Sequence, residues 1–216
     1  MATAQTDGRV ARGNATRRTV LAHTMDIASV EGLEGLSLGR IATELNLSKS
    51  GVFALFGSKE ELQLATVRAA GSVFNKHVIK PAEQHPPGLA RVLAVCGAWS
   101  DYSRARVFPG GCFFSGVSIE FDARSGPVHD AVVNAHRWWS DYVAASIRQA
   151  QDEGELAPAD DPEQLAFEFI AALELAQLYS LLHGDNAAYD RASRAILTRL
   201  ATAATDPAVL PEQLGT

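Results

Sequence analysis

The stretch spanning residues 37–62 constrains the fold most, because helix starts and stops follow one another closely there. Ser37, Ser48 and Ser58 each stand where a side-chain hydroxyl can accept a hydrogen bond from the first turn of a helix. Asn46 lies between the first two starts and tolerates the left-handed backbone of a tight turn. The spacing predicts two short helices joined by a turn, followed by a longer third helix.

Both short helices are expected to be amphipathic. Ile41 and Leu45 mark the apolar face of the first helix, and Val52 and Phe56 mark that of the second. The opposite side of the second helix, which a recognition helix would present to the major groove of DNA, carries Lys49, Ser50 and Phe53. Such pairs also occur in helical cores that bind no DNA, so this pattern alone leaves the two interpretations equal.

The sequence on the N-terminal side favours DNA binding. An apolar stripe from Val20 to Ala28 ends at Gly32 and predicts a supporting helix, as in three-helix DNA-binding modules. Residues 1–14, with Arg17 and Arg18 just beyond them, form a small basic arm. This arm could lie along phosphates, and it could equally be a disordered, solvated tail.

Residues 17–64 resemble the N-terminal domain of the TetR family of transcriptional regulators. The matching features are the helix pattern from Val20 to Gly32, the entry Gly35-Leu36-Ser37, Ile41-Ala42, the short helix from Ser48 to Leu55, and Phe56-Gly57-Ser58-Lys59-Glu60-Glu61-Leu62. Two positions depart from the family pattern. Asn46 stands where Gly is commonest, and Phe53 stands where a Tyr most often contacts a phosphate, a hydrogen bond that Phe cannot donate.

Roles in DNA binding follow from residue type and place. Lys49 and Ser50 are expected to reach base edges, whereas Ser37, Ser48 and Lys59 are better placed for phosphates. Gly51 costs roughly 1 kcal/mol of helix propensity relative to Ala, so its backbone is expected to approach a partner helix or DNA closely. The expected DNA-binding set is completed by Gly51, Phe53, Arg17 and Arg18.

The rest of the chain is helical by pattern, with no alternating strand signal, so the fold class is all-α. We expect a disordered basic arm over 1–14, a helix-turn-helix DNA-binding domain over 15–62, a larger C-terminal helical domain over 63–205 and a loose tail over 206–216. A helix from Ser58 to about Lys80 should link the two domains, with a break from Pro81 to Gly88. The resemblance implies that the C-terminal domain binds an effector and mediates dimerisation.

Charge is distributed unevenly between the N-terminal and C-terminal parts of the chain. The net charge is -6, yet residues 1–60 carry 7 Lys plus Arg against 6 Asp plus Glu, while residues 61–216 carry 12 against 19. Neither an uninterrupted run of 18 apolar residues nor a secretory signal is found, so no membrane partner is expected and the chain should stay in the cytoplasm.

Aromatic residues concentrate between positions 99 and 142 and could line an apolar pocket for a small molecule, or could be ordinary core. The resemblance favours a pocket for an apolar or aromatic effector. The candidate ligand-binding residues are Trp99, Tyr102, Phe113, Phe114, Phe121, Trp138 and Tyr142.

The last two long helices carry small and apolar residues that could pair with a second copy in a four-helix interface, where the resemblance also places it. They could equally cover the core of a single chain. The candidate dimerisation residues are Leu165, Phe169, Ala172, Leu173, Ala176, Tyr179, Ile196, Arg199 and Ala203.

No motif supports catalysis, and we expect neither an enzyme nor a cofactor. His129 and His136 lack a third ligand at metal-binding spacing, so no metal site is expected. Cys112 stands at an expected helix start, which could lower the pKa of its thiol; a redox role and the role of a small buried residue are the two alternatives. The sequence therefore predicts a homodimeric, ligand-responsive repressor of operator DNA, the alternative being a helical adaptor that binds protein.

Overall fold

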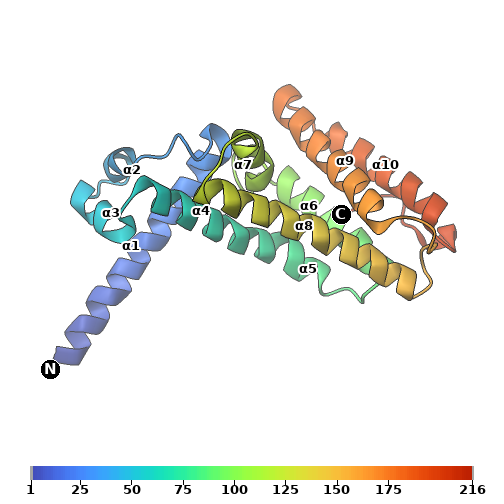
Figure 1. The fold of residues 1–216 in the computed structure, drawn as a ribbon, viewed down its shortest axis with the longest axis horizontal. Coiled ribbons are helices and arrows are strands. Elements are labelled where there is room, and N and C mark those ends of the chain that lie inside the picture. The colour runs from blue at the N-terminus through green and yellow to red at the C-terminus, as the bar shows by residue number, and fades with distance from the viewer. Residues whose placement is uncertain (1, 216) are drawn as a thin grey trace.

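The protein is described here by a computed structural model, which gives the backbone of residues 2–215 and the side chains of residues 11–215 (Figure 1). Its elements are α1 (Ala2–Glu31), α2 (Leu38–Glu44), α3 (Lys49–Phe56), α4 (Lys59–Phe74), the π-helical η1 (Asn75–Ile79), α5 (Lys80–Ala82), α6 (Leu89–Arg104), α7 (Phe113–Phe121), α8 (Pro127–Asp152), α9 (Pro162–His183), α10 (Ala187–Ala203) and the 3-10 helix η2 (Pro207–Val209). Within residues 2–215 the only β pairing is an isolated bridge between Leu156 and Ala204. The prediction of an all-α fold is confirmed.

The three predicted serine caps are present, and an aspartate caps a further helix. The hydroxyls of Ser37, Ser48 and Ser58 accept hydrogen bonds from the third residue that follows each of them, and the Asp161 carboxylate accepts one from Glu163 N. Asn46 has φ 53°, the left-handed turn expected between the short helices. These local signals therefore determine where α2, α3, α4 and α9 begin.

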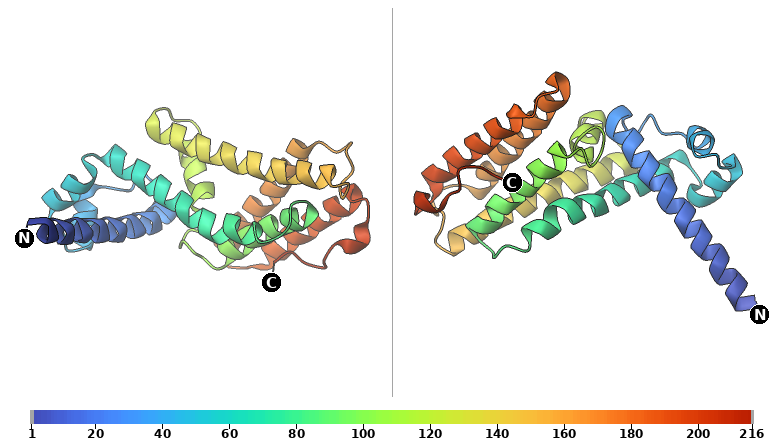
Figure 2. Two further views of the ribbon diagram at one scale, coloured as in Figure 1. Left: turned by 90° about the horizontal axis from the view of Figure 1, so that it is seen from below. Right: turned by 180° about the vertical axis from the view of Figure 1, so that it is seen from behind.

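Helices α1 to α3 gather at one end of the molecule, and α9 and α10 lie side by side at the other (Figures 1 and 2). Helix α4 leaves the first group and runs into the body, where it packs against α8. Its axis continues through η1 into α5, so Pro81 lies inside a helix and the predicted break starts after Ala82. The wider π turn leaves room for a proline ring that would clash with a carbonyl in an α-helix.

Both chain ends differ from the expected loose segments. Helix α1 begins at Ala2, so the backbone of residues 2–14 is helical and not irregular; this stretch contains no proline to stop a helix. At the other end, Leu214 is buried and its N–H donates to Ser193 Oγ of α10 (2.8 Å), because an apolar side chain anchors the segment. Met1 and Thr216 lie outside the described residues.

Candidate nucleic-acid interface and cavity

Helix α3 divides into a packed side and an open side, as its sequence predicts. Val52 and Phe56 are buried, whereas Lys49, Ser50 and Phe53 are exposed. Phe53 has 57% of its surface exposed, which is unusual for an aromatic residue that only supports a core. The open side thus carries a cation, a hydroxyl and an aromatic ring on one short helix, and a recognition helix can present such side chains to the major groove.

Gly51 has a local explanation. A Cβ at this position would lie 2.8 Å from Ser48 Oγ, the same hydroxyl that accepts a hydrogen bond from Gly51 N (3.0 Å). The predicted close approach is therefore to the capping hydroxyl of its own helix. The Ser48 hydroxyl is therefore engaged in the helix cap. The Ser37 hydroxyl is engaged in the same way, because it accepts a hydrogen bond from Arg40 N (3.1 Å).

Two cations near the interface already have partners in the protein. Arg17 donates to Leu55 O (2.6 Å), and its guanidinium lies 4.4 Å from the centre of the Phe56 ring, so it fastens α1 to the end of α3. Lys59 Nζ donates to Glu34 O and to Glu34 Oε2, both at 2.8 Å. Arg18, in contrast, is exposed.

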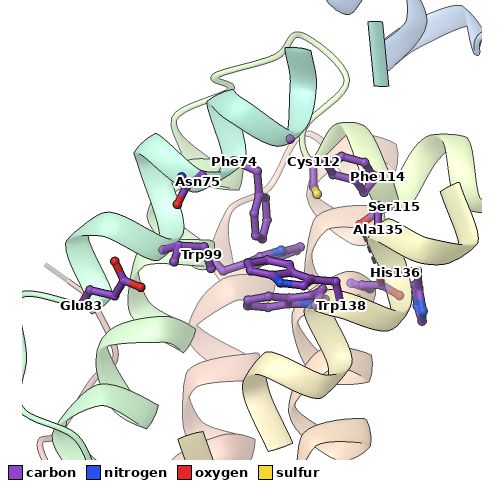
Figure 3. A pocket seen from close by; sticks show the side chains of 14 residues that line it. Phe74, Asn75, Glu83, Trp99, Cys112, Phe114, Ser115, Ala135, His136 and Trp138 are labelled. Carbon is purple, nitrogen blue, oxygen red and sulfur yellow. Dashed lines mark hydrogen bonds between the residues drawn. The ribbon is translucent and has the colours of Figure 1, made fainter. Parts of the chain in front are cut away.

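A cavity of about 410 Å³ opens in the larger part of the molecule (Figure 3). Of the predicted ligand-binding residues, Trp99, Phe114 and Trp138 line it. The other four do not: Tyr102, Phe113 and Phe121 are buried in the surrounding core, and Tyr142 lies beneath Trp138, with ring centres 5.5 Å apart. The aromatic content of the sequence alone does not tell which residues line the cavity and which belong to the core.

Most of the wall residues that escaped prediction lie outside residues 99–142 or are not aromatic. Phe74 comes from α4 and Trp139 from α8, and their rings meet edge to face with centres 5.1 Å apart. The remaining unpredicted members of the wall are Gly71, Asn75, Ile79, Glu83, Cys112, Ser115, Ala135, His136 and Glu174. Within the described chain, no group of three His, Cys, Asp or Glu side chains could hold a metal ion.

Glu174 is the most unusual polar residue of the cavity wall. It projects from α9 among mostly apolar side chains, and burial raises the pKa of its carboxyl. A hydrogen bond from Ser115 Oγ (3.3 Å) and the neighbouring His136 partly oppose that rise in pKa. The wall thus holds a poorly solvated acid.

Cys112 also touches the cavity, but it does not have the environment of a reactive thiol. It is buried, and burial raises its pKa above the ordinary value even though the first turn of α7 lies beside it. The sequence expectation of a lowered pKa at the helix start is therefore wrong, because desolvation outweighs the helix end.

Helix α9 has apolar residues on both sides, which changes the assignment of the predicted dimerisation set. Six residues of that set are buried within the single chain: Leu165, Phe169, Leu173, Ala176, Ile196 and Ala203. Ala172 is half-buried, and Arg199 forms ion pairs with Asp160 and Glu168. Only Tyr179 of that set is exposed. The exposed apolar face of α9 instead consists of Phe167, Leu175, Leu178, Tyr179, Leu181 and Leu182, called the α9 face below.

Helix α9 is also long and apolar enough, by length and composition alone, to cross a membrane. Of its most apolar stretch of 18 residues, 44% is buried inside the structure, where α9 packs against α8 and α10. A sequence search for an uninterrupted apolar run misses this helix because acidic residues such as Glu168 and Glu174 interrupt it.

Helix α7 connects the cavity with the turn before α2. At its start Phe114 and Ser115 line the cavity, and near its end Glu120 accepts hydrogen bonds from Leu33 N (2.7 Å) and Glu34 N (2.9 Å). Gly32 precedes this pair with φ +80°, and a Cβ there would lie 2.5 Å from the Glu120 carboxylate. A glycine is therefore needed both for the backbone conformation and for the close approach.

Comparisons with known proteins agree with this geometry. Residues 20–66 match the model described as bacterial regulatory proteins, tetR family, and residues 88–196, just over half of the chain, match that of the tetracyclin repressor-like C-terminal domain. A comparison with curated proteins gave no match.

Solved structures with the same fold include three regulators. A TetR transcriptional regulator from Chloroflexus aurantiacus is 24% identical, with a TM-score of 0.78 over 88% of this chain and 94% of its own. A TetR family regulator from Cytophaga hutchinsonii is 21% identical (TM-score 0.78, 90% and 98% covered). A regulator from Saccharomonospora viridis, solved in complex with choline, is 18% identical (TM-score 0.70, 88% and 96% covered). With both family models matched in order along the chain, the protein belongs to the TetR family and is a DNA-binding transcriptional regulator.

Proposed function

We propose that the protein is a dimeric repressor that a small molecule releases from its operator DNA. The observation that carries the proposal is the path of α4. Its first turn adjoins the end of α3, and its last turns supply Gly71 and Phe74 to the cavity wall. A molecule that fills the cavity therefore acts on the same rigid helix that positions the recognition helix.

In this proposal residues 15–62 form the DNA-binding domain. Lys49, Ser50 and Phe53 enter the major groove, while Ser37, Ser48 and the exposed Arg18 lie near phosphates. Arg17 and Lys59, which are engaged within the protein, act by holding α1 and α4 in place. Residues 63–205 form the effector-binding and dimerisation domain.

A second copy is proposed to cover the α9 face. One helix-turn-helix reads about one half-site, so a two-fold dimer places two α3 helices in successive major grooves, about 34–36 Å apart. Exposed large apolar residues gathered on one helix mark a protein contact better than single exposed residues do. Phe167, Leu178 and Leu182 repeat at helical spacing along this face.

Two elements would carry the signal from the cavity to DNA. Helix α4 does so through its own length, and α7 does so through the hydrogen bonds of Glu120 to the turn before α2. The π-helical η1 adjoins the cavity at Asn75 and Ile79, and such wide turns are frequent at functional sites. Release follows if the bound molecule favours a different spacing of the two α3 helices.

Selection of bound fragments from genomic DNA tests the proposal. We expect enrichment of a two-fold symmetric site with half-sites one helical turn or a multiple of it apart, bound with an affinity that falls steeply with salt. Lys49→Ala should shift the preferred sequence. Failure to enrich any sequence, together with salt-insensitive binding of a protein partner, would overturn the proposal in favour of an adaptor.

A further inference from the structure

The cavity has an unusual combination of walls. All three tryptophans of the chain, Trp99, Trp138 and Trp139, line it, together with Phe74 and Phe114. In Figure 3 the rings of Phe74, Trp99 and Trp138 gather in the middle of the drawn site. Tryptophan is the aromatic side chain whose ring face attracts cations most strongly.

The charged residues of the cavity wall also favour a cationic ligand. Neither lysine nor arginine lines the cavity, whereas two carboxylates do, Glu83 and Glu174. The ionisable wall residues are completed by His136 and Cys112. A ligand bearing a phosphate or carboxylate would find neither lysine nor arginine in this wall and would lie near two carboxylates. An anionic effector therefore does not fit this wall.

Glu174 supplies the fixed charge. A poorly solvated carboxylate is costly to keep ionised without a partner, and the structure gives it one hydrogen bond, from Ser115, with His136 as its neighbour. A positively charged ligand group would attract this carboxylate electrostatically and offset its lost solvation.

We propose that the cavity binds an organic cation with an apolar body, such as a substituted ammonium, whose charge is held by Glu174 and whose body lies among Trp99, Trp138 and Trp139. The volume of about 410 Å³ is sufficient for a small molecule of this kind. Trp138 is 51% exposed, so its ring stands at the entrance. This inference rests on the proposed function, since it names the class of its effector.

The test uses three probes of similar size: phenyltrimethylammonium, its uncharged carbon isostere tert-butylbenzene, and benzoate. Binding to the full-length protein is followed by tryptophan fluorescence, which reports on the cavity alone because every tryptophan lines it. We expect the cation to bind at least about 10-fold more tightly than the isostere, and benzoate to bind most weakly.

Glu174→Gln should weaken phenyltrimethylammonium binding by roughly 10- to 100-fold and leave tert-butylbenzene unchanged. Glu153→Gln is the matched control, because Glu153 is an exposed acid after α8, outside the cavity. The affinity for the cation should fall as the pH is lowered through the raised pKa of Glu174, and this pH dependence should be reduced in Glu174→Gln.

Equal affinity for the cation and its isostere, preference for benzoate, absence of binding by any probe, or an unchanged cation affinity in Glu174→Gln would overturn the proposal. Operator binding is measured separately. If a neutral or anionic molecule binds the cavity and releases DNA, the cation class is wrong and the proposed function stands. If the cation binds as expected but every cavity ligand leaves DNA affinity unchanged, the proposed function is wrong and the binding chemistry stands.

Discussion

Replacing Phe167 with aspartate should separate the subunits of the proposed dimer. Phe167 is 70% exposed in the single chain, and burial of a whole Phe removes about 150–250 Å² from water. Covering the exposed part would bury roughly 100–175 Å² in each subunit, which contributes about 2.5–4.5 kcal/mol at ~25 cal/mol per Å². Two-fold symmetry doubles this sum, and incomplete burial reduces it by about half. The dimer Kd should therefore rise on the order of 10²- to 10³-fold.

Sedimentation equilibrium measures that Kd directly. Val209→Asp is the control, because Val209 is also an exposed apolar residue (61%) but lies in η2, outside the α9 face. Both variants should keep the helical circular dichroism of the parent chain, since neither position is in the core. A parent chain that stays monomeric at micromolar concentration, or a Phe167→Asp variant that dimerises as tightly as Val209→Asp, would show that the α9 face is not the dimer interface.

Three further predictions concern the DNA end and the thiol. Glu120→Ala should lower the free energy of unfolding by about 1–3 kcal/mol in urea titrations, because the part-buried N–H of Leu33 loses its acceptor; unchanged stability would show that water replaces the carboxylate. In competition assays with mixed DNA sequences, Lys49→Ala should change the order of preference, whereas Lys59→Ala should weaken all sequences alike, because Lys59 only holds the start of α4 against Glu34. Cys112 should react with a thiol reagent only when urea unfolds the chain, because burial raises its pKa and leaves little thiolate; rapid labelling of the folded protein would contradict this.

Local signals in the sequence were sufficient for the helix-turn-helix. A capping serine and its hydrogen bond lie within one turn of the chain, and the left-handed conformation of Asn46 needs no distant partner. The open side of α3 could be predicted for the same reason, since burial of Val52 and Phe56 follows from helical periodicity.

The pairing of distant segments could not be predicted in this way. Helix α9 has apolar residues all round, so periodicity could not tell that Phe169 faces the core and Phe167 faces outward. The same limit applies to the cavity, where Glu174 meets Ser115 across 59 residues. Arg17 and Lys59 looked like free cations because their partners, Leu55 and Glu34, lie far along the chain.

Filling the cavity should change the spacing of the two recognition helices in the dimer. Spin labels at Ala54→Cys, an exposed position on α3, would measure that spacing in the dimer by pulsed electron resonance, because the native cysteines are buried and resist labelling. Without ligand, the distance should match the separation of successive major grooves, which places the two α3 helices about 34–36 Å apart. A ligand that saturates the tryptophan fluorescence should shift the distance distribution and weaken operator binding roughly 5- to 150-fold. An identical distance distribution with the cavity empty and filled would show that the ligand does not act through the spacing of the α3 helices.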